Sequence, residues 1–99
     1  MTRYKLSAAA TADLAGIRDY SAQSWGEARA STYLRDLRHR LRWLAAAPRR
    51  GKHRDDLMTG ILSYPQSSHV IYYRIGREEI EIVRVLHRRM DPVRHFGSK

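Results

Sequence analysis

The sequence predicts an α+β domain in which a hairpin of two helices packs on one face of a small, mainly antiparallel sheet. Two early segments place apolar residues at helical spacing, and three later segments, separated by short turns, are rich in Val, Ile and Tyr. A short strand pattern precedes the helices, so the expected order is β-α-α-β-β-β. Because 99 residues bury enough surface for only one small core, we expect a single domain over residues 1–99.

The N-terminal segment predicts a strand followed by a capped helix. The strand is expected over Thr2–Leu6, and the Ser7 hydroxyl can accept a hydrogen bond from an early helical N–H. The helix is expected over Ala8–Ser24, and Gly26 is a natural end for it. The residues at helical spacing, which we expect to face the core, are Ala10, Leu14, Ile17 and Ser21.

A second helix is expected over Glu27–Ala46, because Pro48 prevents its continuation. Its apolar stripe alternates steps of four and three residues and consists of Ala30, Leu34, Leu37, Leu41 and Leu44. Trp43 lies outside this stripe, so it is either half-buried at a seam or an exposed anchor for a partner.

The segment that follows is expected to be a loop and a short strand. The loop spans Arg49–Gly60, and the strand spans Ile61–Tyr64 and ends at Pro65. A basic run in the loop precedes Asp55 and Asp56. Adjacent side chains on a loop rarely converge on an ion without further ligands, so we expect no metal site there.

The segment Ser68–Asp91 predicts a β-hairpin with strands over His69–Ile75 and Glu79–Leu86. Gly76 is expected to start a turn of two or four residues with a positive φ. One face is expected to be core and carries Ile71, Tyr73, Ile75, Ile80, Ile82 and Leu86. The other face is apolar away from the turn and carries Val70, Tyr72, Val83 and Val85. Since the helical hairpin can cover only one face, we expect these residues to be open to a partner.

The chain carries a formal net charge of +9 and no cysteine. This charge indicates an acidic partner, either nucleic acid or a negatively charged protein, or a generally arginine-rich surface. The lack of cysteine excludes disulfides and thiolate metal sites, and we expect no cofactor. No apolar run approaches the length of a membrane span and no signal-peptide pattern opens the chain, so we expect a soluble, cytoplasmic protein without membrane contact.

A dense basic cluster ends the last strand. Arg84 lies on the face expected to be core, near the end of the sheet, and Arg88 and Arg89 follow the strand. The tail Val93–Lys99 is expected to be a turn or a frayed helix and adds further positive charge.

Several short pieces of the sequence form a recognisable set. They are Tyr4–Ser7 leading into Ala12-Asp13-Leu14 and Ile17, Trp25-Gly26, Tyr33-Leu34, Pro48-Arg49 with Gly51, Ser68–Arg74, and Ile82–Asp91. Together they resemble the ParE branch of the RelE/ParE toxin superfamily over nearly the whole chain. The most specific part is the final strand with its His-Arg-Arg-Met-Asp ending.

The resemblance implies a RelE/ParE-like fold and a non-enzymatic toxin of a type II toxin–antitoxin system. Such toxins inhibit DNA gyrase and so block replication. A ParD-like antitoxin neutralises them in a hetero-oligomer, and the complex reaches operator DNA only through the antitoxin. The residues expected to contact the target are Arg84, His87, Arg88, Arg89 and Met90. Those expected to contact the antitoxin are Trp43, Tyr72 and Val83.

The sequence also leaves two other functions open. RelE-like relatives cut messenger RNA on the ribosome, and the groups here that could serve such chemistry are His69, Arg74, His87, Arg88 and Arg89. No tyrosine follows Tyr73 and no lysine cluster is present, and a backbone-bonded role at the strand end suits His87 better. A basic nucleic-acid-binding module is the third alternative, but Tyr64 and Tyr72 are few aromatic residues for base stacking.

Overall fold

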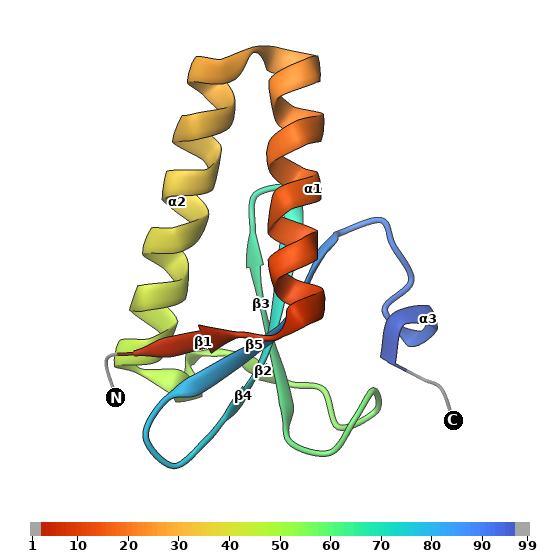
Figure 1. The fold of residues 1–99 in the computed structure, drawn as a ribbon. Coiled ribbons are helices and arrows are strands. Elements are labelled where there is room, and N and C mark those ends of the chain that lie inside the picture. The colour runs from red at the N-terminus through yellow and green to blue at the C-terminus, as the bar shows by residue number, and fades with distance from the viewer. Residues whose placement is uncertain (1–2, 97–99) are drawn as a thin grey trace.

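The computed structural model describes residues 3–96 as a helical hairpin that stands on one face of a five-stranded sheet (Figure 1). This confirms the predicted α+β architecture. The elements in chain order are β1 (Tyr4–Leu6), α1 (Ala8–Trp25), α2 (Glu27–Ala46), the 3₁₀ turn η1 (Pro48–Arg50), β2 (Lys52–His53), β3 (Ile61–Gln66), β4 (His69–Ile75), β5 (Ile80–His87) and α3 (Val93–Phe96).

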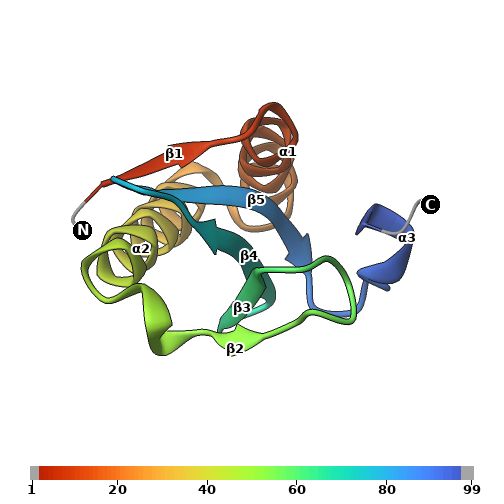
Figure 2. The same cartoon turned by 90° about the horizontal axis from the view of Figure 1, so that it is seen from below.

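The strand order across the sheet is β1-β5-β4-β3-β2. β1 runs parallel to β5, and the other neighbours are antiparallel. Figure 2 shows α1 and α2 on one side of the twisted sheet and α3 apart from them, beside the end of β5. Thr2 and the end of the predicted tail, 97–99, lie outside the described residues. Within the described part, no helix is long and apolar enough to span a membrane.

Both long helices begin and end where their capping residues predict. The Ser7 Oγ atom accepts from the Ala10 N–H at 2.9 Å. Gly26 ends α1 with a φ of 94°, a conformation that favours glycine. Before Pro48, Ala47 leaves helical geometry with a φ of −145°. The predicted core residues of both helices are all buried.

Tyr73 anchors the segment after α2 to the centre of the sheet. Its fully buried side chain donates from the hydroxyl to the Pro48 carbonyl at 2.6 Å and accepts from the Gly51 N–H at 2.9 Å. A Cβ at Gly51 would overlap this hydroxyl and lie 2.9 Å from the ring carbon Cζ. Glycine is therefore required at position 51 because the tyrosine hydroxyl occupies the space of a side chain.

The predicted loop and the predicted end of β3 both need correction. The loop contains β2, whose Lys52 and His53 pair with β3. β3 continues through Pro65 instead of ending there, and Pro65 faces Val70 of β4. β2 pairs with β3 only as far as Ser63, so no strand lies beside Pro65 on that edge of β3. The backbone N–H that proline lacks is therefore not needed for strand pairing there.

The β4–β5 turn has four residues, and Ile75 faces Ile80 across it. Gly76 does not take the positive φ that the sequence suggested. Glycine is needed there for space, because a Cβ would lie 2.7 Å from the Glu79 carbonyl oxygen. Ile75 was predicted to be core and is instead exposed beside the turn.

A β-bulge at Val83 reverses the faces of the last residues of β5. Tyr73 faces Ile82, whereas Tyr72 faces Arg84, so Val83 is the extra residue. Beyond the bulge, Val85 packs in the core under the helices and Leu86 packs on the opposite face. The sequence predicted the reverse for both, because simple alternation assumes an uninterrupted strand.

The chain itself covers the far face of the sheet, which corrects the expectation of an open apolar strip. Tyr72 and Leu86 form a second small core there, against which Leu57 of the β2–β3 loop and Phe96 of α3 pack. The Phe96 ring lies 5.2 Å from that of Tyr72 in an edge-to-face arrangement. Tyr72 is only 4% exposed, and Val83 is half-buried. This face therefore presents no uncovered apolar strip to a partner.

We predict that Gly51→Ala lowers the free energy of unfolding by about 2 kcal/mol, because the new methyl group displaces the Tyr73 hydroxyl from its buried position. Gly16→Ala in α1 is the matched control, since a Cβ there meets no atom within 4 Å. It should raise the free energy of unfolding by about 0.5–1 kcal/mol. Urea unfolding measures both. Equal effects of the two substitutions would contradict the role assigned to Tyr73.

Candidate functional site beside the end of β5

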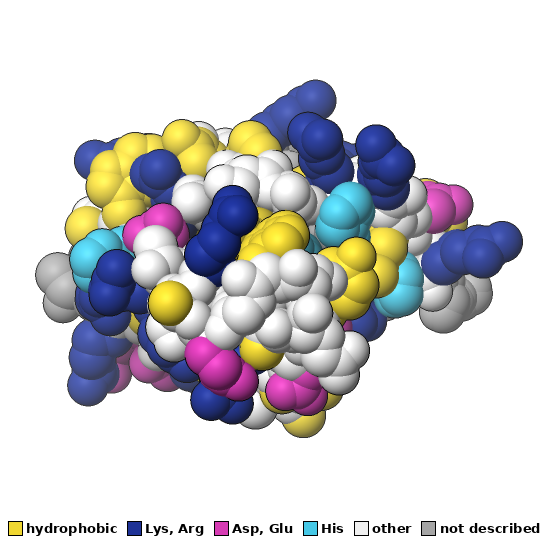
Figure 3. All heavy atoms as spheres, turned by 90° about the horizontal axis from the view of Figure 1, so that it is seen from above, with side chains coloured by type: hydrophobic (Ala, Val, Ile, Leu, Met, Phe, Trp, Pro, Cys, Tyr) yellow, Lys and Arg dark blue, Asp and Glu magenta, His cyan; other side chains and the backbone are white. Residues whose placement is uncertain are grey.

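A hollow of about 540 Å³ with mainly apolar walls lies between α1 and the end of β5. It brings together four residues that the sequence singled out: His69, Arg84, His87 and Met90. α1 contributes the opposite wall, which includes Asp13, Gly16, Tyr20 and Trp25. In a view from above, histidine and hydrophobic side chains lie next to each other on this molecule, with Lys and Arg side chains around them (Figure 3).

The Asp13 carboxylate of α1 clamps the edge of β5. It accepts from Arg84 Nε and Nη2, both at 2.8 Å, and from the Val85 backbone N–H at 2.9 Å. The side chains of Arg84 and Asp13 are only 21% and 13% exposed, so the pair is largely shielded from water. The hydrogen bond that Arg84 donates to Asp13 raises the pKa of Arg84 above its usual value. Arg84, expected to contact a target, is thus engaged within the molecule.

His69 is held in one neutral form by Tyr33 of α2. The Tyr33 hydroxyl lies 2.6 Å from His69 Nδ1 and accepts from the Ser68 N–H at 3.3 Å. We assign the hydroxyl proton to Nδ1, because this contact is far shorter than the 3.5 Å contact of the same hydroxyl with the Gln66 carbonyl, and the imidazole proton then lies on Nε2. Burial and, to a smaller extent, the nearby His87 together lower the pKa of His69 from 6.5 to about 4.

His87 has the backbone-bonded arrangement expected of a strand-end histidine. Its Nδ1 accepts from the Arg89 N–H at 3.1 Å. Its ring lies 5.4 Å from that of His69, edge to face, and both rings line the hollow. Because Nδ1 accepts in each ring, neutral His69 and His87 both carry their proton on Nε2.

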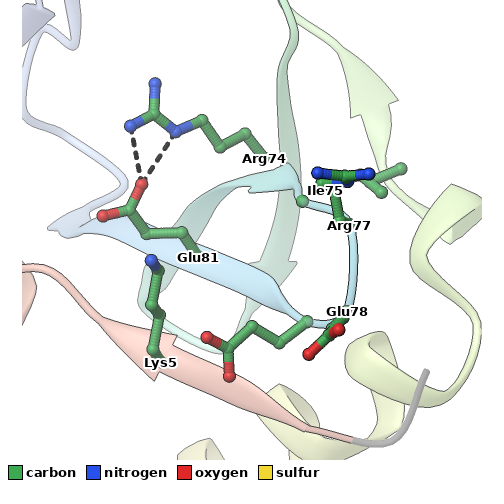
Figure 4. A pocket seen from close by; sticks show the side chains of 8 residues that line it. Lys5, Arg74, Ile75, Arg77, Glu78 and Glu81 are labelled. Carbon is green, nitrogen blue, oxygen red and sulfur yellow. Dashed lines mark hydrogen bonds and ion pairs between the residues drawn. The ribbon is translucent and has the colours of Figure 1, made fainter.

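The remaining candidates for target contact or for ribonuclease chemistry are divided between two places. Arg88 and Arg89 are exposed in the turn after β5, close to the hollow. Arg74 lies near the opposite end of β4, five residues or about 16 Å along the strand from His69. There it pairs with Glu81 at 2.7 Å in a separate hollow beside the β4–β5 turn (Figure 4).

The three residues expected to contact an antitoxin do not share one surface. Trp43 lies at a half-buried seam near Tyr64. The Arg40 and Arg50 guanidinium groups lie over its ring, at 4.4 and 4.0 Å from the ring centre. Tyr72 and Val83 belong to the covered far face. Antitoxin contact by these three side chains remains a prediction that the fold does not favour.

The sequence did not single out the α1 wall as part of a site. Asp13 precedes the buried Leu14 and lies one turn before the buried Ile17, and this position of an acidic residue beside the core was an available signal. Gly16 and Tyr20 gave no comparable signal in an alanine-rich helix. Among residues 3–96, no cluster of His, Cys, Asp or Glu has an arrangement that could hold a metal ion.

Comparison with known proteins agrees with the fold and covers nearly all of the chain. Residues 4–92 match the family model described as the ParE toxin of the type II toxin–antitoxin system parDE. The chain is 39% identical over 97 residues to Toxin ParE1 of Caulobacter vibrioides, covering 98% of this chain and 100% of that protein. It is 42% identical over 96 residues to Toxin ParE1 of Mycobacterium tuberculosis, and the match covers 96% of this chain and 98% of that protein.

A solved structure described as the chromosomal ParDE TA system from P. aeruginosa contains a chain of the same fold. The TM-score is 0.76 at 22% identity, over 88% of this chain and 96% of that chain. At this identity the likeness concerns the fold, including the helical hairpin on one face of the sheet.

We predict that Asp13→Ala lowers the free energy of unfolding by about 2–3 kcal/mol, because it leaves Arg84 and the Val85 N–H without their acceptor in a largely buried place. Arg74→Ala breaks the exposed pair with Glu81 and should cost less than about 1 kcal/mol. Urea unfolding of both variants tests this contrast. A loss for Asp13→Ala as small as that for Arg74→Ala would show that the clamp does not hold the edge of β5.

We also predict an acid-sensitive contribution of His69 to stability. The folded pKa of about 4 lies below the ordinary value of 6.5, so between these values the unfolded chain takes up a proton that the folded chain does not. This contribution is complete above pH 6.5 and is lost as the pH falls towards 4. His69→Asn keeps an acceptor for Tyr33 but removes the titration. Urea unfolding at pH 7 and near pH 4.5 should therefore show that the free energy of unfolding falls more for the natural protein than for His69→Asn. Equal falls in the two proteins would refute the assignment.

Proposed function

This chain belongs to the ParE toxin family of type II toxin–antitoxin systems, and we propose that a ParD-like antitoxin holds it inactive and that the released toxin inhibits DNA gyrase. The observation that carries the proposal is the family match over residues 4–92, at about 40% identity to full-length ParE1 toxins. The match includes β5 and the basic turn that follows it.

The arrangement of the titratable groups supports a toxin that acts by binding and does not cut RNA. A general base needs a free lone pair near the substrate. In both histidines the Nδ1 lone pair already accepts an internal hydrogen bond, and Nε2 carries the proton. Arg74 lies about 16 Å from His69, on the basis of the strand rise, and is paired with Glu81. These contacts occupy one ring nitrogen of each histidine and keep Arg74 away from both rings.

The charge of the chain supports an acidic antitoxin as the neutralising partner. The formal net charge is +9, and the basic turn after β5 is exposed. Complementary charge speeds the encounter of two proteins more than it tightens their complex. A toxin that must be captured soon after synthesis benefits from such attraction.

We predict that the double substitution Arg88→Ala and Arg89→Ala abolishes growth inhibition, because these exposed cations contact the target. The matched control is Arg38→Ala with Arg42→Ala, which removes the same charge from an exposed face of α2. Expression of the natural protein should stop DNA synthesis while protein synthesis continues. Purified protein should inhibit gyrase supercoiling, and the Arg88/Arg89 variant should do so at least tenfold less effectively.

Loss of protein synthesis with cleaved transcripts, before any effect on DNA synthesis, would contradict the proposal and favour a ribonuclease. Unchanged toxicity of the Arg88/Arg89 variant would show that the basic turn is merely solvated. If both double variants lost growth inhibition to the same extent, the effect would come from net charge and not from a contact of Arg88 and Arg89. Circular dichroism confirms that each variant is folded.

A further inference from the structure

The hollow beside β5 contains a glycine that the chain itself does not require. Gly16 lies in the middle of α1, where glycine is less favourable than alanine. Its φ is not in the left-handed region, and a Cβ there would meet no atom within 4 Å. Neither the backbone nor internal packing explains the glycine. Its effect is to enlarge the hollow that it lines.

Exposed apolar side chains surround this hollow. Tyr20, Trp25 and Met90 all line it and are 67%, 42% and 48% exposed. Large apolar residues exposed together at the rim of a hollow mark a binding surface. The volume of about 540 Å³ is within the range of pockets that enclose large apolar groups.

Two hydrogen-bond donors complete the site. His69 and His87 use Nδ1 as an internal acceptor, so each has an Nε2–H left for another partner. No acceptor for either Nε2–H is found within residues 3–96. The Arg84 charge is already matched by Asp13, whereas Arg88 and Arg89 leave the surroundings positive. A carboxylate is the acceptor that fits two imidazole N–H groups in positive surroundings.

We propose that this hollow anchors a large apolar side chain of the antitoxin that is followed closely by a carboxylate. The inference rests on the proposed function, since it takes the antitoxin as the occupant. A second copy of this chain is disfavoured because two molecules of charge +9 repel each other. Nucleic acid is disfavoured because the apolar walls offer no match for phosphates. An acidic, amphipathic segment satisfies both the apolar walls and the two donors.

The first experiment uses isothermal titration calorimetry to measure the affinity of this chain for the proposed ParD-like antitoxin. Gly16→Leu places a large side chain in the hollow, since a Cβ at this position meets no atom within 4 Å, and it should weaken binding at least tenfold. Ala15→Leu is the matched control, because Ala15 is exposed on α1 and does not line the hollow. Ala15→Leu should bind the antitoxin with a Kd within twofold of that of the natural protein. Thermal melting verifies that both variants are folded.

The second variant tests the donors. His69→Asn with His87→Asn keeps an acceptor for Tyr33 and for the Arg89 N–H but removes both Nε2–H groups. It should weaken antitoxin binding about tenfold, as expected for hydrogen bonds to a charged group. A probe that needs no antitoxin gives an independent measurement. N-acetylphenylalanine should shift the NMR signals of Gly16 and His87 and bind at least threefold more tightly than its amide, which lacks the carboxylate.

The outcomes separate this inference from the proposed function. If the natural protein binds the antitoxin tightly and Gly16→Leu binds it equally, the hollow is not the anchor and the inference is overturned, while the function stands. If Gly16→Leu keeps antitoxin binding but loses gyrase inhibition, the occupant is the target and the inference is also overturned. If the natural protein binds no antitoxin, the proposed function itself fails. Equal binding of N-acetylphenylalanine and its amide overturns the carboxylate requirement.

Discussion

The loss of a strand neighbour halfway along β5 is the constraint on which the rest of the structure depends. β1 pairs with β5 only as far as Ile82, so the remaining edge needs other partners for its backbone groups. α1 supplies them: the Ser7 hydroxyl donates to the Val83 carbonyl at 2.8 Å, and Asp13 accepts from the Val85 N–H. The same carboxylate holds Arg84. α1 is thereby fixed against the end of β5, and the hollow between them has a defined shape.

The helices could be predicted from the sequence because their signals are local. Core spacing in α1 and α2, the Ser7 cap and the Gly26 end each depend on a few neighbouring residues. The bulge at Val83 could not be predicted, because it is decided by contacts between residues about 70 positions apart, such as Asp13 with Val85. The covering of the far face also depends on tertiary packing, in this case of Leu57 and Phe96.

The candidate site could be predicted only in part, for the same reason. Sequence patterns placed His69, Arg84, His87 and Met90 near the end of the hairpin, and the fold brings them to one hollow. Their roles depend on partners from the helices, since Tyr33 determines the proton position of His69 and Asp13 neutralises Arg84. Residue type alone suggested that Arg84 is a free cation and that the histidines are free bases, whereas the fold pairs Arg84 with Asp13 and leaves the histidines as N–H donors beside an apolar wall.

The most direct test of the role assigned to Asp13 is a double-mutant cycle between Asp13 and Arg84 on the free energy of unfolding. Asp13→Ala, Arg84→Ala and the double variant are compared with the natural protein by urea unfolding. If the clamp holds α1 to β5, the double variant should lose about 1.5–3 kcal/mol less than the sum of the single losses. Losses that add to within about 0.5 kcal/mol would show that the two side chains act independently and that other contacts hold the edge of β5.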